Sequence, residues 1–258
     1  MNKYGICKLG FIPLRKEADH RSEMVSQLLF GETYSVVDKR GEWLQVVQTF
    51  DNYTGWITSK VFCPVKENFM EEINKETPSY STGMYQQAGS KDQFVMLGFG
   101  SRLPLWDGAA FFIGDEEFVT RGEVRHEEAD LSSDGLLNMA MSLLGTPYIW
   151  GGKSTFGIDC SGFVQTIFKF KSLYLPRDAY QQEQNGIPID FSNRKQNDLA
   201  FFSNEYGRVV HVGLLLSMDK IIHASGRVRI DRFDEKGIFN EEGNEYTHSL
   251  ASIRRLFD

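Results

Sequence analysis

The chain has 258 residues, 41% of them hydrophobic, and a formal net charge of -7 at pH 7. This charge and the lack of a basic stripe argue against nucleic-acid partners and against binding to anionic membranes. No stretch approaches the roughly 18 consecutive apolar residues of a membrane-spanning helix, and the first residues lack the apolar core of a secretory leader. We expect a cytoplasmic monomer without membrane insertion, or a periplasmic or extracellular protein if a leader was removed.

The first 65 residues have the pattern of a small β-barrel. Strand-like runs occupy residues 3–15, 22–40, 42–49 and 54–62, and turn signals such as Arg40-Gly41 separate them. Many short strands with glycine and asparagine turns are typical of small barrels and sandwiches. The Pro-Leu-Arg, Glu-Trp-Leu-Gln-Val and Thr-Gly-Trp-Ile segments are similar to those of bacterial SH3-like domains. This resemblance predicts an SH3-like domain over residues 1–65.

Residues 66–126 are predicted to form a linker and a second, degenerate SH3-like domain. The segment 65–82 is charged and polar, which favours a linker or a surface helix, and strand-like runs follow at 94–107 and 109–119. The chain is longer than one catalytic unit, so several domains are expected. Residues 127–258 are then predicted to be the catalytic domain.

Cys160 lies where a glycine-rich loop passes into a predicted helix. Phe163, Val164 and Ile167 follow at the spacing of a buried helical stripe, and Asp159 can cap the helix. Free backbone N–H groups and the positive end of the helix dipole at this position favour a thiolate. We therefore expect a reactive thiol, although a lone cysteine at a helix start is more often a packed apolar residue.

A predicted β-hairpin supplies a base for this thiol. His211 begins the apolar run 211–217, and His223 lies near the end of the run 220–225. Paired antiparallel strands bring both histidines to one face of a sheet, where His211 can act as general base and His223 can orient it. A zinc site made of Cys160, His211 and His223 is the alternative, but it lacks the fourth ligand and the short cysteine spacing of structural zinc sites. We expect no metal and no cofactor.

Six sequence blocks in residues 134–258 carry a family resemblance: GTPYIWGG, GIDCSGF, LPRDAYQQ, NDLAFF, HVGLLL and IIHASGRVRI. In this order they resemble the NlpC family of bacterial cell-wall cysteine peptidases. The resemblance implies that Cys160 is the nucleophile, His211 the base and His223 the third residue, with the Tyr148 hydroxyl and the Cys160 N–H stabilising the oxyanion. The predicted fold class is multidomain α+β: two small SH3-like β-barrels followed by a papain-like α+β peptidase domain.

Within this family the chain resembles a dipeptidyl-peptidase subgroup whose Arg-Asp-Ser stretch lines the substrate cleft. Arg177 and Asp178 match that stretch, whereas Ala179 replaces the serine. The resemblance implies that Asp178 binds the free α-amine of an N-terminal L-alanine, that Ser161 contacts substrate, and that Tyr53 helps to close the cleft. It predicts cleavage of the γ-D-glutamyl-L-diamino acid bond of peptidoglycan stem peptides, with release of L-Ala-D-Glu during muropeptide recycling.

Several alternatives stay open at this point. Tyr148 could pack against Trp150, and Tyr53 could simply cover the end of a hairpin. The protein could be a broader hydrolase of intact peptidoglycan, a catalytically weak cell-wall-binding module, or an acyltransferase or amidase on the same scaffold. Lysine and diaminopimelate are both open as the third substrate residue, and Cys7 and Cys63 could form a disulfide.

Overall fold

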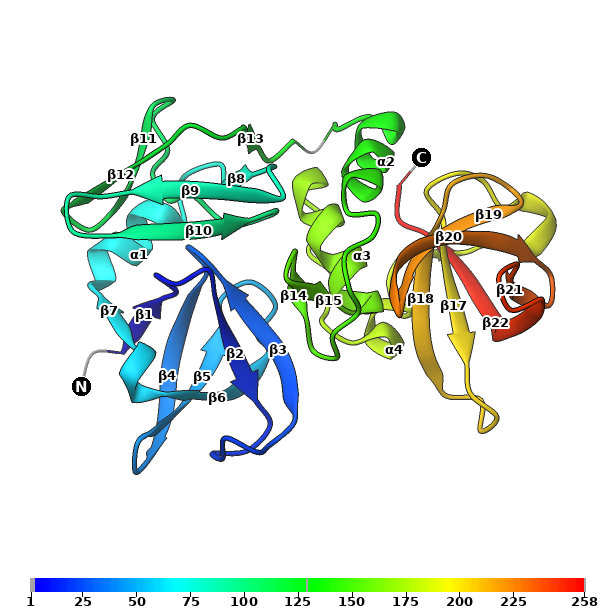
Figure 1. The fold of residues 1–258 in the computed structure, drawn as a ribbon, viewed down its shortest axis with the longest axis horizontal. Coiled ribbons are helices and arrows are strands. Elements are labelled where there is room, and N and C mark those ends of the chain that lie inside the picture. Colours follow the sequence, from blue (N-terminus) through cyan, green and yellow to red (C-terminus); the bar gives the residue numbers. More distant parts are fainter. Residues whose placement is uncertain (1–2, 129, 258) are drawn as a thin grey trace. The chain divides into compact units, whose positions relative to one another are not determined.

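The computed structural model describes residues 3–128 and 130–257 (Figure 1). The described chain forms two compact units. Unit 1 comprises Met1–Ala129 with Trp150–Phe156, and unit 2 comprises Asp130–Ile149 with Gly157–Asp258. Over the described ranges, the structure contains no helix long and apolar enough to cross a membrane.

Unit 1 begins with an antiparallel sheet in the order β3-β2-β6-β5-β4-β1-β7. Its core contains Ile12, Leu14, Leu44, Val46 and Ile57. In β2 and β5 these buried residues alternate with more exposed ones, as expected for strands with one face in the core. The predicted strands of the first 65 residues are thus confirmed. The elements are β1 (Tyr4–Ile6), β2 (Phe11–Arg15), β3 (Met24–Leu29), β4 (Thr33–Arg40), β5 (Trp43–Gln48), β6 (Thr54–Thr58), η1 (Ser59–Val61) and β7 (Cys63–Val65).

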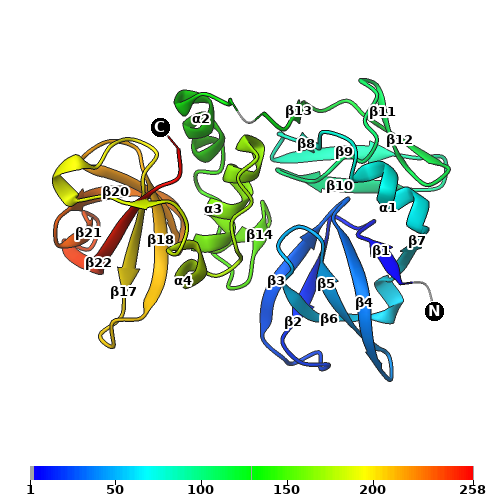
Figure 2. The ribbon, with the colours of Figure 1, turned by 180° about the vertical axis from the view of Figure 1, so that it is seen from behind.

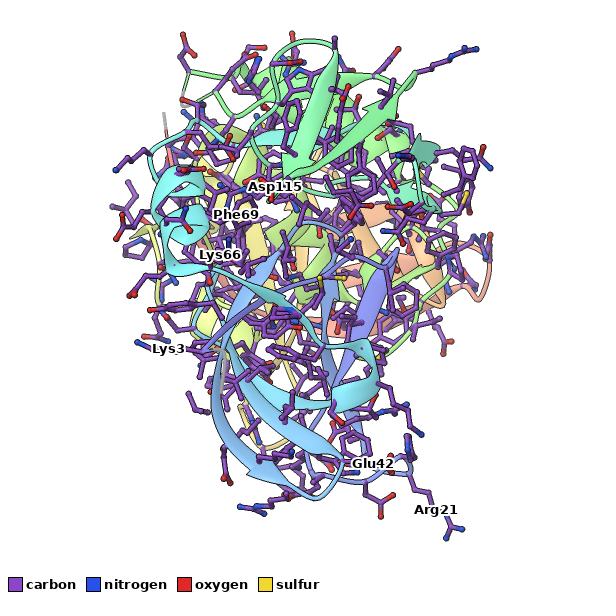
Figure 3. All side chains as sticks on the ribbon, turned by 90° about the vertical axis from the view of Figure 1, so that its left-hand side faces the viewer. Lys3, Arg21, Glu42, Lys66, Phe69 and Asp115 are labelled. Carbon is purple, nitrogen blue, oxygen red and sulfur yellow. The ribbon has the colours of Figure 1, made fainter. Side chains whose placement is uncertain are left out.

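The next part of unit 1 combines a helix with a second antiparallel sheet. Helix α1 (Glu67–Ile73) occupies the predicted linker (Figure 2), and Phe69 on it is labelled in Figure 3. Its Phe69, Met70 and Ile73 are buried in a core shared with this sheet. The sheet has the order β10-β9-β12-β11, and β8 pairs separately with β13. An SH3-like identity for this part stays a prediction. Its strands are β8 (Ser79–Ser81), β9 (Tyr85–Gly89), β10 (Phe94–Gly98), β11 (Ala110–Ile113), β12 (Glu116–Thr120) and β13 (Val124–His126).

Residues 150–156 precede the helix that begins at Cys160 but belong to unit 1. Within this segment β14 (Lys153–Ser154) lies beside β3. The Lys153 backbone N–H donates to Gln27 Oε1 at 2.9 Å, and its buried ammonium pairs with Glu32 at 3.3 Å. These contacts hold the glycine-rich loop against the first sheet.

Gly151 shows why this loop needs glycine. Its φ is +78°, in the left-handed region that side chains disfavour, and a Cβ there would lie 2.3 Å from the Met24 carbonyl oxygen. The glycine-rich loop therefore approaches neighbouring backbone closely at Gly151.

Unit 2 combines helices with a closed β-barrel. Its sheet has the order β16-β22-β17-β18-β19-β20-β21, and β22 also pairs with β21, which closes strands β17 to β22 into a barrel (Figure 1). Helix α3 packs against α2, β18 and β19. The helices and the short strand before the barrel are α2 (Ser133–Ser142), β15 (Gly157–Ile158), α3 (Cys160–Phe168), η2 (Lys169–Lys171) and α4 (Ala179–Gln182).

The barrel region contains the predicted histidine hairpin. It is formed by β18 and β19, which pair antiparallel with Gly213 opposite His223. Both the predicted helix at Cys160 and this hairpin are confirmed. The elements of this region are β16 (Ile187–Pro188), η3 (Phe191–Asn193), β17 (Leu199–Ser203), β18 (Val209–Leu215), β19 (Lys220–Ser225), β20 (Arg227–Asp234), β21 (Gly237–Asn240) and β22 (Glu245–Arg255).

Candidate active site

Cys160 is the first residue of α3, as its sequence context predicts. Asp159 is the N-cap, and its carboxylate accepts a hydrogen bond from the Gly162 N–H at 2.7 Å, so the predicted cap is confirmed. Every residue of α3 is buried. The helix packs against β18 and β19, the strands that carry the two candidate histidines.

The thiol of Cys160 is less acidic than the sequence argument expects. Burial, and after it the charge of Asp159, raise its pKa to about 12, although backbone hydrogen bonds and the charge of Arg177 oppose this shift. Desolvation of the charged form thus outweighs the favourable effect of the helix N-terminus. The thiol needs a base to take its proton during the reaction.

His211 of β18 and His223 of β19 are hydrogen-bonded to each other across the hairpin. Nε2 of His211 lies 2.8 Å from Nδ1 of His223, and both side chains are buried. The two strands approach closely here because Gly213 has no side chain: a Cβ at this position would lie 2.9 Å from the Cβ of His223. The predicted convergence of the two histidines is confirmed, while their catalytic roles stay predictions.

The zinc alternative is not favoured by this geometry. The hydrogen bond points one nitrogen of His211 and one of His223 at each other, so these two nitrogens do not converge on a common ion. Over residues 3–128 and 130–257 there is also no group of three or more histidine, cysteine or acidic side chains placed to hold a metal.

His211 is a neutral imidazole at neutral pH. Burial, followed by the neighbouring His223 and His248, lowers its pKa well below the usual value. A neutral ring can accept a proton, as a general base must. Its Nε2 faces His223, so Nδ1 is the ring nitrogen that takes no part in this hydrogen bond.

His248 of β22 is a neighbour of His211 that the sequence did not single out. Its ring stacks on that of His211, with 4.1 Å between centroids and an angle of 27° between the planes. Burial, and then His223, lower the pKa of His248 to about 4. The contact depends on closure of the barrel by β22, which no local pattern in the sequence reveals.

Asp231 of β20 continues the line of polar groups behind the histidines. Its Oδ2 lies 2.9 Å from Nε2 of His223, and its Oδ1 accepts a hydrogen bond from Nη2 of Arg229 at 2.8 Å. Arg229 is opposite His223 in the β19–β20 register, so residues 229 and 231 lie on the histidine face of the sheet. This contact depends on the register between β19 and β20, so no local pattern in the sequence identifies Asp231.

Arg177 and Ser161, both predicted to contact substrate, lie in one buried network with Asp159. Nη1 of Arg177 donates to Asp159 Oδ1 at 3.0 Å and to Ser161 Oγ at 2.8 Å. The Arg177 side chain is only 2% exposed. The network therefore fixes the start of α3, and direct substrate contact by either residue stays a prediction.

Tyr148 is held beside the start of α3 by backbone contacts. It forms a parallel bridge with Ile158, and its N–H donates to the Gly226 carbonyl at 2.9 Å. Burial first, and then the charges of Cys160 and Asp159, raise the pKa of its hydroxyl. The hydroxyl therefore keeps its proton and can donate a hydrogen bond, as an oxyanion ligand must.

The remaining predicted residues lie in separate elements. Asp178 is the half-buried N-cap of α4, and its backbone N–H donates to Gln181 Oε1 at 3.3 Å. Tyr53 lies in unit 1 directly before β6, and its N–H donates to Asp51 Oδ1 at 3.0 Å. Their substrate roles stay predictions. Cys7 and Cys63 are free thiols, so the disulfide left open by the sequence is not formed.

Comparison with known proteins identifies the family. Residues 145–242 match the NlpC/P60 family, and residues 14–61 match the bacterial dipeptidyl-peptidase SH3 domain. The γ-D-glutamyl-L-lysine dipeptidyl-peptidase of Bacillus subtilis is 30% identical over 90% of this chain and 81% of its own length. Dipeptidyl-peptidase 6 of Lysinibacillus sphaericus is 34% identical over 86% of this chain and 89% of its own length.

A solved structure supports the same assignment at the level of fold. The crystal structure of an NlpC/P60 family protein from Bacillus cereus matches with a TM-score of 0.83 at 23% identity, over 98% of this chain and 99% of that chain. The fold and the site thus define a cysteine peptidase with an N-terminal SH3-like domain. The chain belongs to the NlpC/P60 family.

Proposed function

We propose that this peptidase hydrolyses the γ-D-glutamyl-L-diamino acid bond of peptidoglycan stem peptides that begin with a free L-alanine. The observation that carries the proposal is the His211–His223 hydrogen bond on the strands that pack against the Cys160 helix. The names of the relatives from Bacillus subtilis and Bacillus cereus, both γ-D-glutamyl-L-lysine dipeptidyl-peptidases, support the bond and the dipeptide product.

In the first step His211 Nδ1 takes the thiol proton while Cys160 Sγ bonds to the γ-carbonyl carbon of D-glutamate. Because the thiol and the imidazole are both neutral at rest, proton transfer accompanies attack. The hydroxyl of Tyr148 and the backbone N–H of Cys160 donate to the oxygen that becomes negative. The tetrahedral intermediate then breaks its C–N bond, and the imidazolium of His211 gives its proton to the departing amine.

In the second step water hydrolyses the thioester. His211 Nδ1 removes a proton from the water, the hydroxyl oxygen bonds to the acyl carbon, and the C–S bond breaks. The sulfur recovers a proton from His211, and L-Ala-D-Glu leaves with a free carboxylate. His223 keeps the ring of His211 oriented throughout, through the 2.8 Å bond between Nε2 and Nδ1.

Specificity for the free amine is assigned to the Asp178 carboxylate. An ammonium group adds a charged contact to this half-buried carboxylate, whereas an acetylated amine brings no positive charge to it and binds more weakly. Ala179 cannot supply the hydroxyl that the related subgroup has at this position, a loss on the order of 1 kcal/mol. Tyr53 is proposed to narrow the cleft, and recycling of wall peptides in the cytoplasm is the proposed setting.

Product analysis tests this function. Purified protein is incubated with L-Ala-γ-D-Glu-L-Lys, L-Ala-γ-D-Glu-diaminopimelate and their N-acetylated forms, and the products are identified by mass spectrometry. Release of L-Ala-D-Glu from the free-amine peptides only is the expected result. Equal cleavage of the acetylated peptides would instead indicate a broader wall hydrolase, and no cleavage of any peptide would favour a binding module.

A further inference from the structure

We propose that Asp231 is a positioning residue that sets the protonation pattern of both histidines, so that His211 presents an unprotonated Nδ1 to the thiol. The inference rests on the proposed roles of Cys160 and His211. It extends the Cys–His–His arrangement by a fourth group, which lies 2.9 Å from the outer nitrogen of His223.

The argument follows from the donor and acceptor capacity of each group. A carboxylate only accepts hydrogen bonds, so His223 must carry its proton on Nε2, facing Asp231. In a neutral ring Nδ1 of His223 is then an acceptor, and the 2.8 Å contact requires a proton on Nε2 of His211. Burial lowers the pKa of His211, so its ring is neutral and its Nδ1 holds the free lone pair.

The opposite pattern would disable the base. If His223 carried its proton on Nδ1, that proton would be donated to Nε2 of His211, and the His211 proton would lie on Nδ1. Nδ1 of His211, the nitrogen proposed to accept the Cys160 proton, would then have no free lone pair. The Asp231–His223 hydrogen bond selects between these two tautomer patterns. Its effect on the reaction rate is therefore expected to exceed its effect on the free energy of unfolding.

Arg229 keeps Asp231 in the required state. Burial alone would raise the pKa of Asp231, but hydrogen bonds from His223 and Arg229 and the charges of both residues together lower it, so the carboxylate is ionised. Arg229 is itself held by Glu242 Oε2 at 3.1 Å and by Asn240 Oδ1 at 3.0 Å. The nearby guanidinium also offsets part of the negative charge of the Asp231 carboxylate, on which His223 is oriented.

Nitrogen-15 NMR of the histidine rings tests the pattern in the unaltered protein. The expected spectrum near neutral pH has protonated Nε2 and unprotonated Nδ1 at both His211 and His223. The signals of each ring are assigned by their loss in His211→Gln or His223→Gln. A proton on Nδ1 of either ring would overturn the proposal. This measurement needs no substrate, so it stands even if the peptides proposed above are not cleaved.

A variant then tests the consequence. In Asp231→Asn the amide oxygen is drawn to Arg229 and the NH₂ group faces His223 Nε2, which reverses both tautomers. We expect the rate of Cys160 alkylation by iodoacetamide, mapped by mass spectrometry, to fall at least about 100-fold, and kcat to fall comparably with KM changed little, in line with the loss of a triad carboxylate. Asp219→Asn, in an exposed turn of the same barrel, is the matched control and should behave as wild type.

The outcomes separate the possible failures. A folded Asp231→Asn protein with wild-type alkylation and unchanged histidine tautomers would overturn the proposal. Loss of alkylation together with reversed tautomers supports it, whether or not a substrate has been found. If Asp231→Asn does not fold, the NMR result on the unaltered protein decides.

Discussion

Nη1 of Arg177 lies 3.0 Å from Oδ1 of Asp159, and both side chains are buried directly beneath the first turn of α3. The same carboxylate caps the helix through the Gly162 N–H. One ion pair therefore fixes the point at which the chain turns into the helix that carries Cys160. This role is structural, and it acts on the nucleophile through the position of its helix.

Arg177→Met is expected to lower the free energy of unfolding by about 3–5 kcal/mol, because it removes the cation paired with a buried carboxylate. Urea unfolding of unit 2, followed by circular dichroism, measures this loss. Arg208→Met, at an exposed position, should cost less than about 1 kcal/mol. Equal losses in the two variants would contradict the assigned role of the buried pair.

Gly213→Ala is expected to lower kcat by about 10–100-fold, because displacement of a catalytic group by less than an ångström is sufficient for such a loss. The added Cβ would lie 2.9 Å from the His223 Cβ and 2.7 Å from Ile221 Cδ1, so the orienting histidine has to move. Val210→Ala on the same strand, at a position 48% exposed, is the control. Steady-state kinetics with unchanged kcat in Gly213→Ala would show that His223 tolerates the shift.

The pH dependence of stability follows from His248. Its pKa in the folded protein is about 4, against 6.5 for an unperturbed ring, so the unfolded chain takes up a proton first as the pH falls. The contribution to stability is complete above about pH 6.5 and is lost as the pH falls towards 4. His211, whose pKa is also lowered, acts in the same direction.

His248→Phe keeps an aromatic ring against His211 but cannot take up a proton. We expect it to reduce the loss of unfolding free energy between neutral pH and pH 4 by about 2 kcal/mol. Denaturant unfolding at several pH values checks this, with His20→Phe, an exposed histidine of unit 1, as the control. An acid loss in His248→Phe as large as in wild type would contradict the assignment.

Asp178→Asn is expected to raise KM for peptides with a free L-alanine by about 10–100-fold, because the ammonium group loses its charged partner. Discrimination against the N-acetylated peptides should narrow by the same factor, while kcat changes little. Competition assays with free and acetylated peptides measure the ratio directly. Unchanged discrimination would mean that another group recognises the amine.

Local sequence patterns were sufficient for the elements that carry Cys160, His211 and His223. The apolar spacing after Cys160 predicted α3, and two apolar runs joined by a short turn predicted the hairpin of His211 and His223. Both are short-range features, in which helix periodicity or strand pairing follows from neighbouring residues. The positions of these three residues could therefore be predicted without knowledge of the fold.

The rest of the site depends on long-range packing. The stack of His248 on His211 exists because β22 closes the barrel, and the contact of Asp231 depends on the register between β19 and β20. The high pKa of Cys160 reflects burial, which belongs to the folded protein and has no local sequence signal. The glycine-rich loop was evident in the sequence. The ion pair between Lys153 and Glu32 was not, because it joins residues far apart in the sequence.

The most direct test of the account is to trap the acyl-enzyme. Rapid acid quench during turnover of L-Ala-γ-D-Glu-L-Lys, followed by intact-mass analysis and peptide mapping, should detect one L-Ala-D-Glu acyl group bound to Cys160. Cys160→Ala should fold normally, carry no adduct and show no turnover. An adduct on another residue, or turnover near the wild-type rate in Cys160→Ala, would contradict the assignment of Cys160 as the nucleophile.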